Sequence, residues 1–168
     1  MLGGAVEPGS PVRTLASYDG SLFAGTGAYD REPKVWRWIG TDWVLLKNFR
    51  DGEWYINQDS VWSLASTNGR LYAGLMGQGG SSPIFVYDGK RWNKIKSIPG
   101  CQYAKLAVID NRLWVGTNSG RVFCLEDSDW KEKPIKQPYG ILSLAQYNNF
   151  VYAGTYGEGR IYRLPYPR

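Results

Sequence analysis

The sequence predicts an all-β protein, a single β-propeller domain with four blades of four antiparallel strands. Three observations lead to this fold class. A motif of one aliphatic residue, one aromatic residue, Ala or Val, and Gly occurs four times, at residues 22–25, 71–74, 113–116 and 151–154. The four glycines are 49, 42 and 38 residues apart, a period typical of propeller blades. No stretch shows helical periodicity, while Gly-rich turns and 15% aromatic residues fit small twisted sheets.

Each copy of the motif is expected to begin with a β-hairpin. A leucine lies seven residues before the motif in every copy, and two turn-forming residues separate them. The turn pairs are Asp19-Gly20, Asn68-Gly69, Asp110-Asn111 and Asn148-Asn149. Such residues adopt positive φ at low cost, as a two-residue hairpin turn requires.

A second hairpin is expected in the later part of each copy. After a loop of variable length, β-rich runs occupy residues 35–39, 84–87, 121–125 and 160–164. In the first three copies a further turn leads to Trp43, Trp92 and Trp130, which would begin the fourth strand. Because these tryptophans and the motif aromatics recur at fixed positions, we expect them to pack between neighbouring sheets.

The blades are expected at about residues 12–48, 61–98, 103–135 and 141–164. The last copy ends after its third strand, and the apolar residues 1–6 are expected to complete it. Two forms of closure follow: a closed four-bladed monomer, or half of an eight-bladed ring completed by a second copy. A half ring left open would expose sheet faces and an unpaired edge, so the chain is expected either to close or to dimerise.

Composition limits the class of protein further. The 168 residues are 43% hydrophobic, enough to bury a core. No run of 18 apolar residues and no signal peptide is seen, so we expect no membrane partner and a cytoplasmic location, or secretion if a leader has been removed. Cys101 and Cys124 are expected to be buried thiols, although a disulfide is also compatible with the sequence.

The net charge of +5 is concentrated in residues 90–136, where ten Lys or Arg face five Asp or Glu. Most of these cations fall on predicted turns and fourth strands, which are outermost in a propeller. They are therefore expected to form a solvated rim. A nucleic-acid stripe is the alternative, but the mixture of cations with acids disfavours it.

The sequence predicts no catalytic residue, no cofactor and no metal. The chain has no His, which removes the commonest general base and metal ligand. Paired carboxylates alone could still hydrolyse a glycoside, so a carbohydrate-active hydrolase or lyase stays an alternative. The carboxylates near variable loops are Asp30, Glu32, Asp51, Glu53, Asp59 and Glu158.

The repeated pattern, with Leu71-Tyr72-Ala73-Gly74 as its clearest copy, resembles the blades of bacterial β-propellers in the broad Kelch and sialidase-like group. The resemblance covers residues 12–164 and implies the architecture. It transfers no catalytic residue, because Ser17-Tyr18-Asp19-Gly20 has its Gly one position too early for the sialidase Asp-box.

The leading hypothesis is a non-catalytic binding or assembly module that recognises a glycan or a peptide through long variable loops. The loop at residues 49–60 carries the expected site. Trp54 and Tyr55 would anchor the ligand, and Asp51, Glu53 and Gln58 would supply polar contacts. Tyr156 is expected on the same face. A third hypothesis is a structural half ring whose partner is a second copy of itself.

Overall fold

The computed structural model describes residues 6–28, 31–51, 58–77, 80–135 and 138–165. All regular secondary structure in these residues is β. The strands are β1 (Val12–Tyr18), β2 (Ser21–Thr26), β3 (Lys34–Trp38), β4 (Trp43–Asn48), β5 (Gln58–Thr67), β6 (Arg70–Gly77), β7 (Ser81–Tyr87), β8 (Trp92–Pro99), β9 (Ala104–Ile109), β10 (Arg112–Thr117), β11 (Val122–Glu126), β12 (Asp129–Lys133), β13 (Ile141–Tyr147), β14 (Phe150–Thr155) and β15 (Ile161–Pro165).

The strands form four separate antiparallel sheets, each a simple meander in chain order. The sheets are β1–β4, β5–β8, β9–β12 and β13–β15. The hairpin turns use the predicted residues: Asp19, Asn68 and Asn148 have φ of 46°, 50° and 51°. The all-β propeller with four blades is therefore confirmed.

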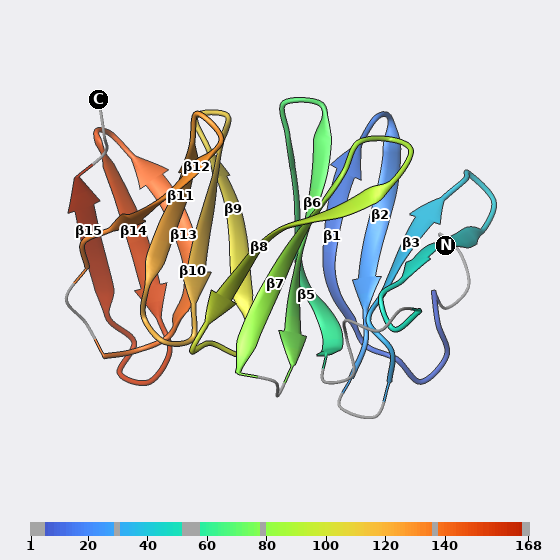
Figure 1. Ribbon diagram of the computed structural model, residues 1–168, viewed down its shortest axis with the longest axis horizontal. Coiled ribbons are helices and arrows are strands. Elements are labelled where there is room, and N and C mark those ends of the chain that lie inside the picture. Colours follow the sequence, from blue (N-terminus) through green and yellow to red (C-terminus); the bar gives the residue numbers. More distant parts are fainter. Residues whose placement is uncertain (1–5, 29–30, 52–57, 78–79, 136–137, 166–168) are drawn as a thin grey trace.

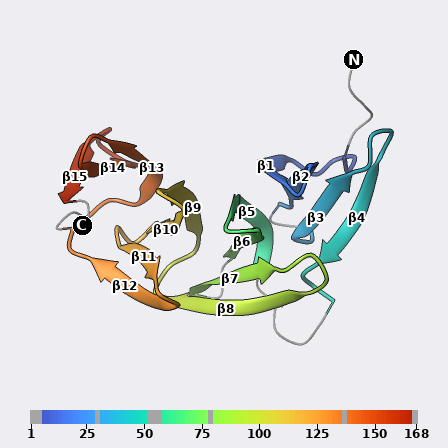
Figure 2. The same ribbon diagram turned by 90° about the horizontal axis from the view of Figure 1, so that it is seen from above.

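The four blades form an open arc. Figure 1 shows the sheets side by side, and Figure 2 shows that β1, β5, β9 and β13 line the concave side while β4, β8 and β12 lie on the convex side. The first and fourth sheets are the two ends of this arc. The described residues thus form an open arc and not a closed four-bladed ring, and completion of the ring by a second copy stays a prediction.

The core lies between successive sheets. Phe23, Val35 and Phe49 of the first blade pack against Leu71 and Phe85 of the second. Equivalent clusters join the second blade to the third and the third to the fourth. The second and third blades therefore each turn one face toward the preceding blade and the other toward the following blade.

The fourth sheet has three strands among the described residues. The prediction that residues 1–6 complete it lies almost wholly outside that part, and it stays a prediction. The described chain after this segment is tied to the first blade: Glu7 accepts hydrogen bonds from Lys34 Nζ at 2.6 Å and from Thr26 Oγ1 at 2.9 Å.

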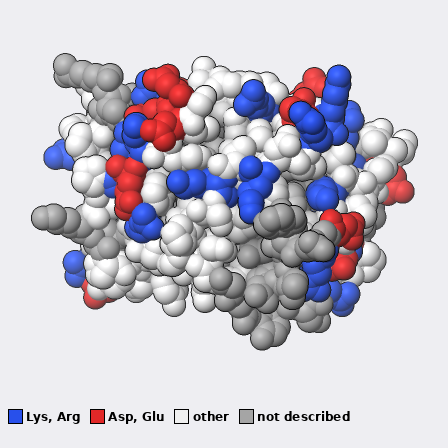
Figure 3. All heavy atoms as spheres, in the orientation of Figure 1, with Lys and Arg blue, Asp and Glu red and all other residues white. Residues whose placement is uncertain are grey.

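The convex side carries both signs of charge. Figure 3 shows Lys and Arg interspersed with Asp and Glu there. Arg121 pairs with Glu132 at 2.7 Å, and Lys131 pairs with Asp129 at 2.5 Å.

Cys101 and Cys124 are buried free thiols, which confirms the prediction of buried thiols over the disulfide alternative. No helix in the described residues is long and apolar enough to cross a membrane.

Candidate functional site at the two ends of the arc

The predicted loop site is only partly within the described residues. Glu53, Trp54 and Tyr55 lie outside them, and so does the side chain of Gln58, whose backbone begins β5. Asp51 is exposed after β4, and Tyr156, 69% exposed, lies between β14 and β15. These two belong to opposite ends of the chain of blades, so the structure does not bring them together (Figure 2).

The carboxylates of the hydrolase alternative are dispersed. Glu32 accepts from Asn48 Nδ2 at 2.8 Å, and Glu158 pairs with Arg160. Asp59 is almost completely buried, and this burial raises its pKa, with Arg50 opposing. Asp30 and Glu53 lie outside the described residues. No cluster of three metal-ligating side chains occurs in the described part of the chain.

A more informative feature is the face of the first blade that no other blade covers. Leu64 and Leu106 occupy equivalent positions on the inner strands of the second and third blades, where the preceding blade buries them to 6% and 5% exposure. Leu15 holds the same position in the first blade and is 56% exposed. Leu22 is likewise exposed, whereas its counterpart Leu71 is fully buried.

Strand register extends this apolar face across the whole first sheet. Leu15 pairs with Ala24, Ala24 with Trp36, and Trp36 with Leu45, and paired residues of antiparallel strands share a face. Trp38, two residues from Trp36, therefore lies on the same face. We call this surface, comprising Leu15, Leu22, Trp36, Trp38 and Leu45, the Leu15 face.

The opposite end of the arc carries a matching apolar surface on the fourth blade. Val35, Ile84 and Val122 each pair with the motif glycine of their own blade, and each is 0% exposed. Ile161 pairs with Gly154 in the same way but is 75% exposed. We call the surface formed by Ser143, Ala145, Tyr147, Tyr152, Gly154 and Ile161 the Ile161 face. Arg163, which pairs with Tyr152, lies on this face too.

The interior junctions show how such faces fit together. A Cβ atom on Gly25 would lie 2.7 Å from Val61 Cγ1, so the first residues of β5 pack directly onto that glycine. Gly74 meets Ala104, and Gly116 meets Ile141, in the same manner. The residues that pack onto these glycines are all 0% exposed: Val61, Ala104 and Ile141. Their counterpart in the first blade is Val12, which is 45% exposed.

A polar contact accompanies this packing. Thr14 Oγ1 accepts a hydrogen bond from Leu64 N at 3.0 Å, and Ser63 Oγ accepts one from Leu106 N at 3.0 Å. In the fourth blade the residue at this position is Ser143, which is exposed on the Ile161 face. The donor at the equivalent position of the first blade is Leu15 N. The first blade therefore presents the donor of this contact, and the fourth blade presents the acceptor.

The N-terminal segment covers one margin of the Leu15 face. Thr26 Oγ1 accepts from Trp36 Nε1 at 3.0 Å and donates to Glu7, which Lys34 also contacts. Burial opposes the ionisation of Glu7, but the hydrogen bonds from Lys34 and Thr26 outweigh it and lower its pKa. Contact with Glu7 raises the pKa of Lys34.

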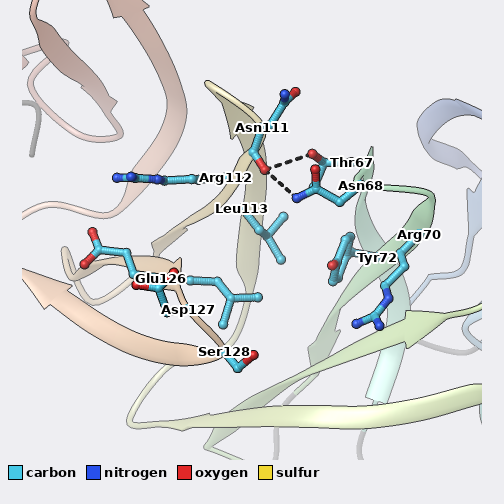
Figure 4. Close-up of a pocket in the computed structure, with 11 residues that line it drawn as sticks. Thr67, Asn68, Arg70, Tyr72, Asn111, Arg112, Leu113, Glu126, Asp127 and Ser128 are labelled. Carbon is cyan, nitrogen blue, oxygen red and sulfur yellow. Dashed lines mark hydrogen bonds between the residues drawn. The ribbon is translucent and has the colours of Figure 1, made fainter. Parts of the chain in front are cut away.

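A groove of about 580 Å³ lies between the second and third blades, on the edge of tight turns rather than on the edge of variable loops. Asn111 O accepts from Thr67 Oγ1 at 3.0 Å and from Asn68 Nδ2 at 2.8 Å, which joins the two turns. Figure 4 shows Arg112 and Arg70 on opposite sides of the groove. Sequence reasoning missed this groove because it searched the variable loops.

The comparisons with known proteins show the fold. No family model matches the chain, and no curated protein matches it. The computationally designed Ika4 protein is 18% identical, with a TM-score of 0.65, and covers 99% of this chain and 100% of its own. The designed Ika8 protein is 17% identical, with a TM-score of 0.63 over 93% of this chain and 46% of its own. YCF48 bound to D1 peptide is 18% identical, with a TM-score of 0.59 over 92% of this chain and 51% of its own. This chain thus spans about half the length of Ika8 and of YCF48.

Proposed function

We propose that this chain is a non-catalytic assembly module, half of an eight-bladed ring that closes when two copies join end to end. The observation that carries the proposal is Ile161, which is 75% exposed although its counterparts in the three other blades are fully buried. Burying a large aliphatic side chain contributes about 1.5–3 kcal/mol, so its exposure favours a covering blade.

The occupant is argued from the repeat itself. Every interior junction joins a surface like the Ile161 face to a surface like the Leu15 face. The Ile161 face and the Leu15 face themselves are not covered by any described blade. In the ring, the partner's Val12 would lie against Gly154, and the hydroxyl of Ser143 would accept from the partner's Leu15 N. Two head-to-tail junctions of this kind close a ring when the rotation is complete. The match to just under half of Ika8 supports this geometry.

The test is the mass of the purified chain in solution, measured by size-exclusion chromatography with light scattering. We expect twice the mass of a single chain at tens of micromolar. A single-chain mass over the whole accessible concentration range would overturn the proposal.

A second candidate function is peptide recognition by the assembled ring. Two observations favour it: the similar YCF48 structure holds a D1 peptide, and the groove between the second and third blades has room for a short segment. The loop site of Asp51, Glu53, Trp54, Tyr55, Gln58 and Tyr156 is the competing location. Binding of a peptide library should be lost on Trp54→Ala if the loop carries it, and on Arg70→Ala if the groove does.

A further inference from the structure

Three of the four inner strands share a feature that the ring does not explain. They carry a β-bulge at the same place, and the extra residues are Arg13, Trp62 and Leu142. A bulge re-aims a side chain out of the regular alternation of its strand. All three extra residues line one cavity of about 280 Å³ together with Val12 and Lys105. The lining residues thus come from the inner strands of all four blades, β1, β5, β9 and β13, which lie on the concave side of the arc (Figure 2).

These positions vary while their surroundings do not. The residue two places after each bulge residue is a leucine in every case, Leu15, Leu64 and Leu144. The bulge residues themselves are a cation, an aromatic and an aliphatic residue. Variation confined to one place on a repeated scaffold is typical of a binding site.

Arg13 is held in place by one contact from the second blade and one from its own blade. Its Cζ lies 5.7 Å from the centroid of the Trp62 ring, and that ring stacks on Tyr103 at 4.9 Å and 25°. Arg13 Nε donates to Gly27 O at 3.4 Å. This contact uses one of the five N–H donors of the guanidinium.

The cavity has an unbalanced charge. Arg13 and Lys105 are its charged lining residues, and no ion pair joins either of them to a carboxylate within the described residues. Other cations of the chain do have such partners, as Lys133 has in Glu126 at 2.5 Å. Two uncompensated cations beside the apolar Leu142 are suited to an anion that carries an apolar group.

We infer that this cavity binds a small organic anion, with its carboxylate or phosphate between Arg13 and Lys105 and its apolar part beside Leu142. The cavity is slightly smaller than the roughly 300–1,000 Å³ of sites for drug-sized molecules, which favours a single-ring compound. The inference goes beyond the proposed ring, because one copy supplies every lining residue.

The experiment is a calorimetric titration of the full chain with phenyl phosphate and with benzoate, which separate a phosphate from a carboxylate preference. Arg13→Gln and Lys105→Gln should each weaken binding of the preferred probe about tenfold or more, since hydrogen bonds to charged groups contribute about that much. Lys96→Gln on the convex side removes the same charge and is the matched control. It should leave binding unchanged, and inorganic phosphate should bind more weakly than phenyl phosphate.

The titration is repeated in the Ile161→Lys background, which removes the proposed junction and alters none of the residues that line the cavity. Failure of the ring therefore does not affect this measurement. The inference is overturned if neither probe binds at about 10 mM. A Kd of about 1 mM, already a weak site, would be nearly saturated at that concentration. It is also overturned if either cation variant binds as the unaltered chain does while circular dichroism shows it folded.

Discussion

Gly116 of the third blade lies directly against Ile141 of the fourth, so closely that a Cβ atom on the glycine would be 2.6 Å from Ile141 Cβ. Gly154 holds the same position in the fourth blade, but a Cβ there would meet the side chain of Ser143 in its own sheet and no described residue of another blade. The glycine is thus required where an inner strand of the next blade approaches. Gly154 is the glycine at this position at the end of the arc, where no described blade packs against it.

The two glycines should respond differently to the same substitution. Gly116→Ala should lower the free energy of unfolding by about 1–3 kcal/mol, because the added methyl group overpacks a closed junction. Gly154→Ala should change the stability of a separate half little, yet weaken dimerisation. Denaturant unfolding measures the first effect and light scattering the second. Equal destabilisation of both variants would contradict this account of the junction.

Ile161→Lys should convert the dimer to single chains, because the junction would have to bury a charge without a partner. Val44→Lys is the matched control, since Val44 is also an exposed strand residue but lies outside both end faces. Light scattering at several concentrations should give a single-chain mass for the first variant only. A dimer that survives Ile161→Lys would place the interface elsewhere.

Leu64→Ala and Leu15→Ala compare one repeat position in a closed and an open junction. In the Ile161→Lys background, Leu64→Ala should cost about 2–5 kcal/mol of unfolding free energy, because it leaves a cavity in the core. Leu15→Ala should change it by only about 0.5 kcal/mol or less, as surface substitutions do. Urea denaturation measures both, and similar losses would show that Leu15 is already covered.

The contact between Glu7 and Lys34 should make stability depend on pH. Because the pKa of Glu7 is lowered in the folded chain, its ionised form stabilises the fold. That contribution is complete well above the ordinary value of 4.5 and is lost as the pH falls through the lower folded value. Glu7→Gln should cost about 1–3 kcal/mol at pH 7. In urea unfolding at different pH values, the difference from the unaltered chain should shrink below pH 4.5, and a constant difference would exclude the charge as its cause.

The buried thiols should be unreactive in the folded chain. Burial raises the pKa of Cys124 to about 11, and Cys101 is shifted in the same direction by its own burial. Since the thiolate is the reactive form, iodoacetamide at pH 8 should modify neither residue until urea unfolds the chain. Mass spectrometry after timed alkylation counts the modified thiols. Rapid modification of the native chain would show that one of them is accessible.

Local signals in the sequence were enough for the fold, because each blade is specified by its own turn residues and strand pattern. Asp19-Gly20 and Asn68-Gly69 form the predicted turns, and Trp92 packs as expected, with its ring 5.4 Å from Phe49. The extent of the loop before the second blade was wrong. β5 begins at Gln58. The prediction missed this start because buried polar residues such as Ser60 show no alternation of apolar and polar residues.

The site was harder to predict, because it depends on what covers a residue and not on what the residue is. Ile161 and Val122 are equivalent in type and position, and only the arrangement of the blades distinguishes them. The bulges that turn Arg13 and Trp62 into the concave hollow depend on a strand register that no local pattern reveals. The proposed loop residues Trp54 and Tyr55 lie outside the described part of the chain.

The curvature of the arc has a consequence for stoichiometry. Two unlike ends that fit each other could in principle add copies without limit, as in a filament. In the proposed ring, two copies that join at both pairs of ends leave no end for a third. A copy altered at Leu15 and another altered at Ile161 would then complement each other through their one intact pair of ends, and the resulting heterodimer would stay unsealed on its other side.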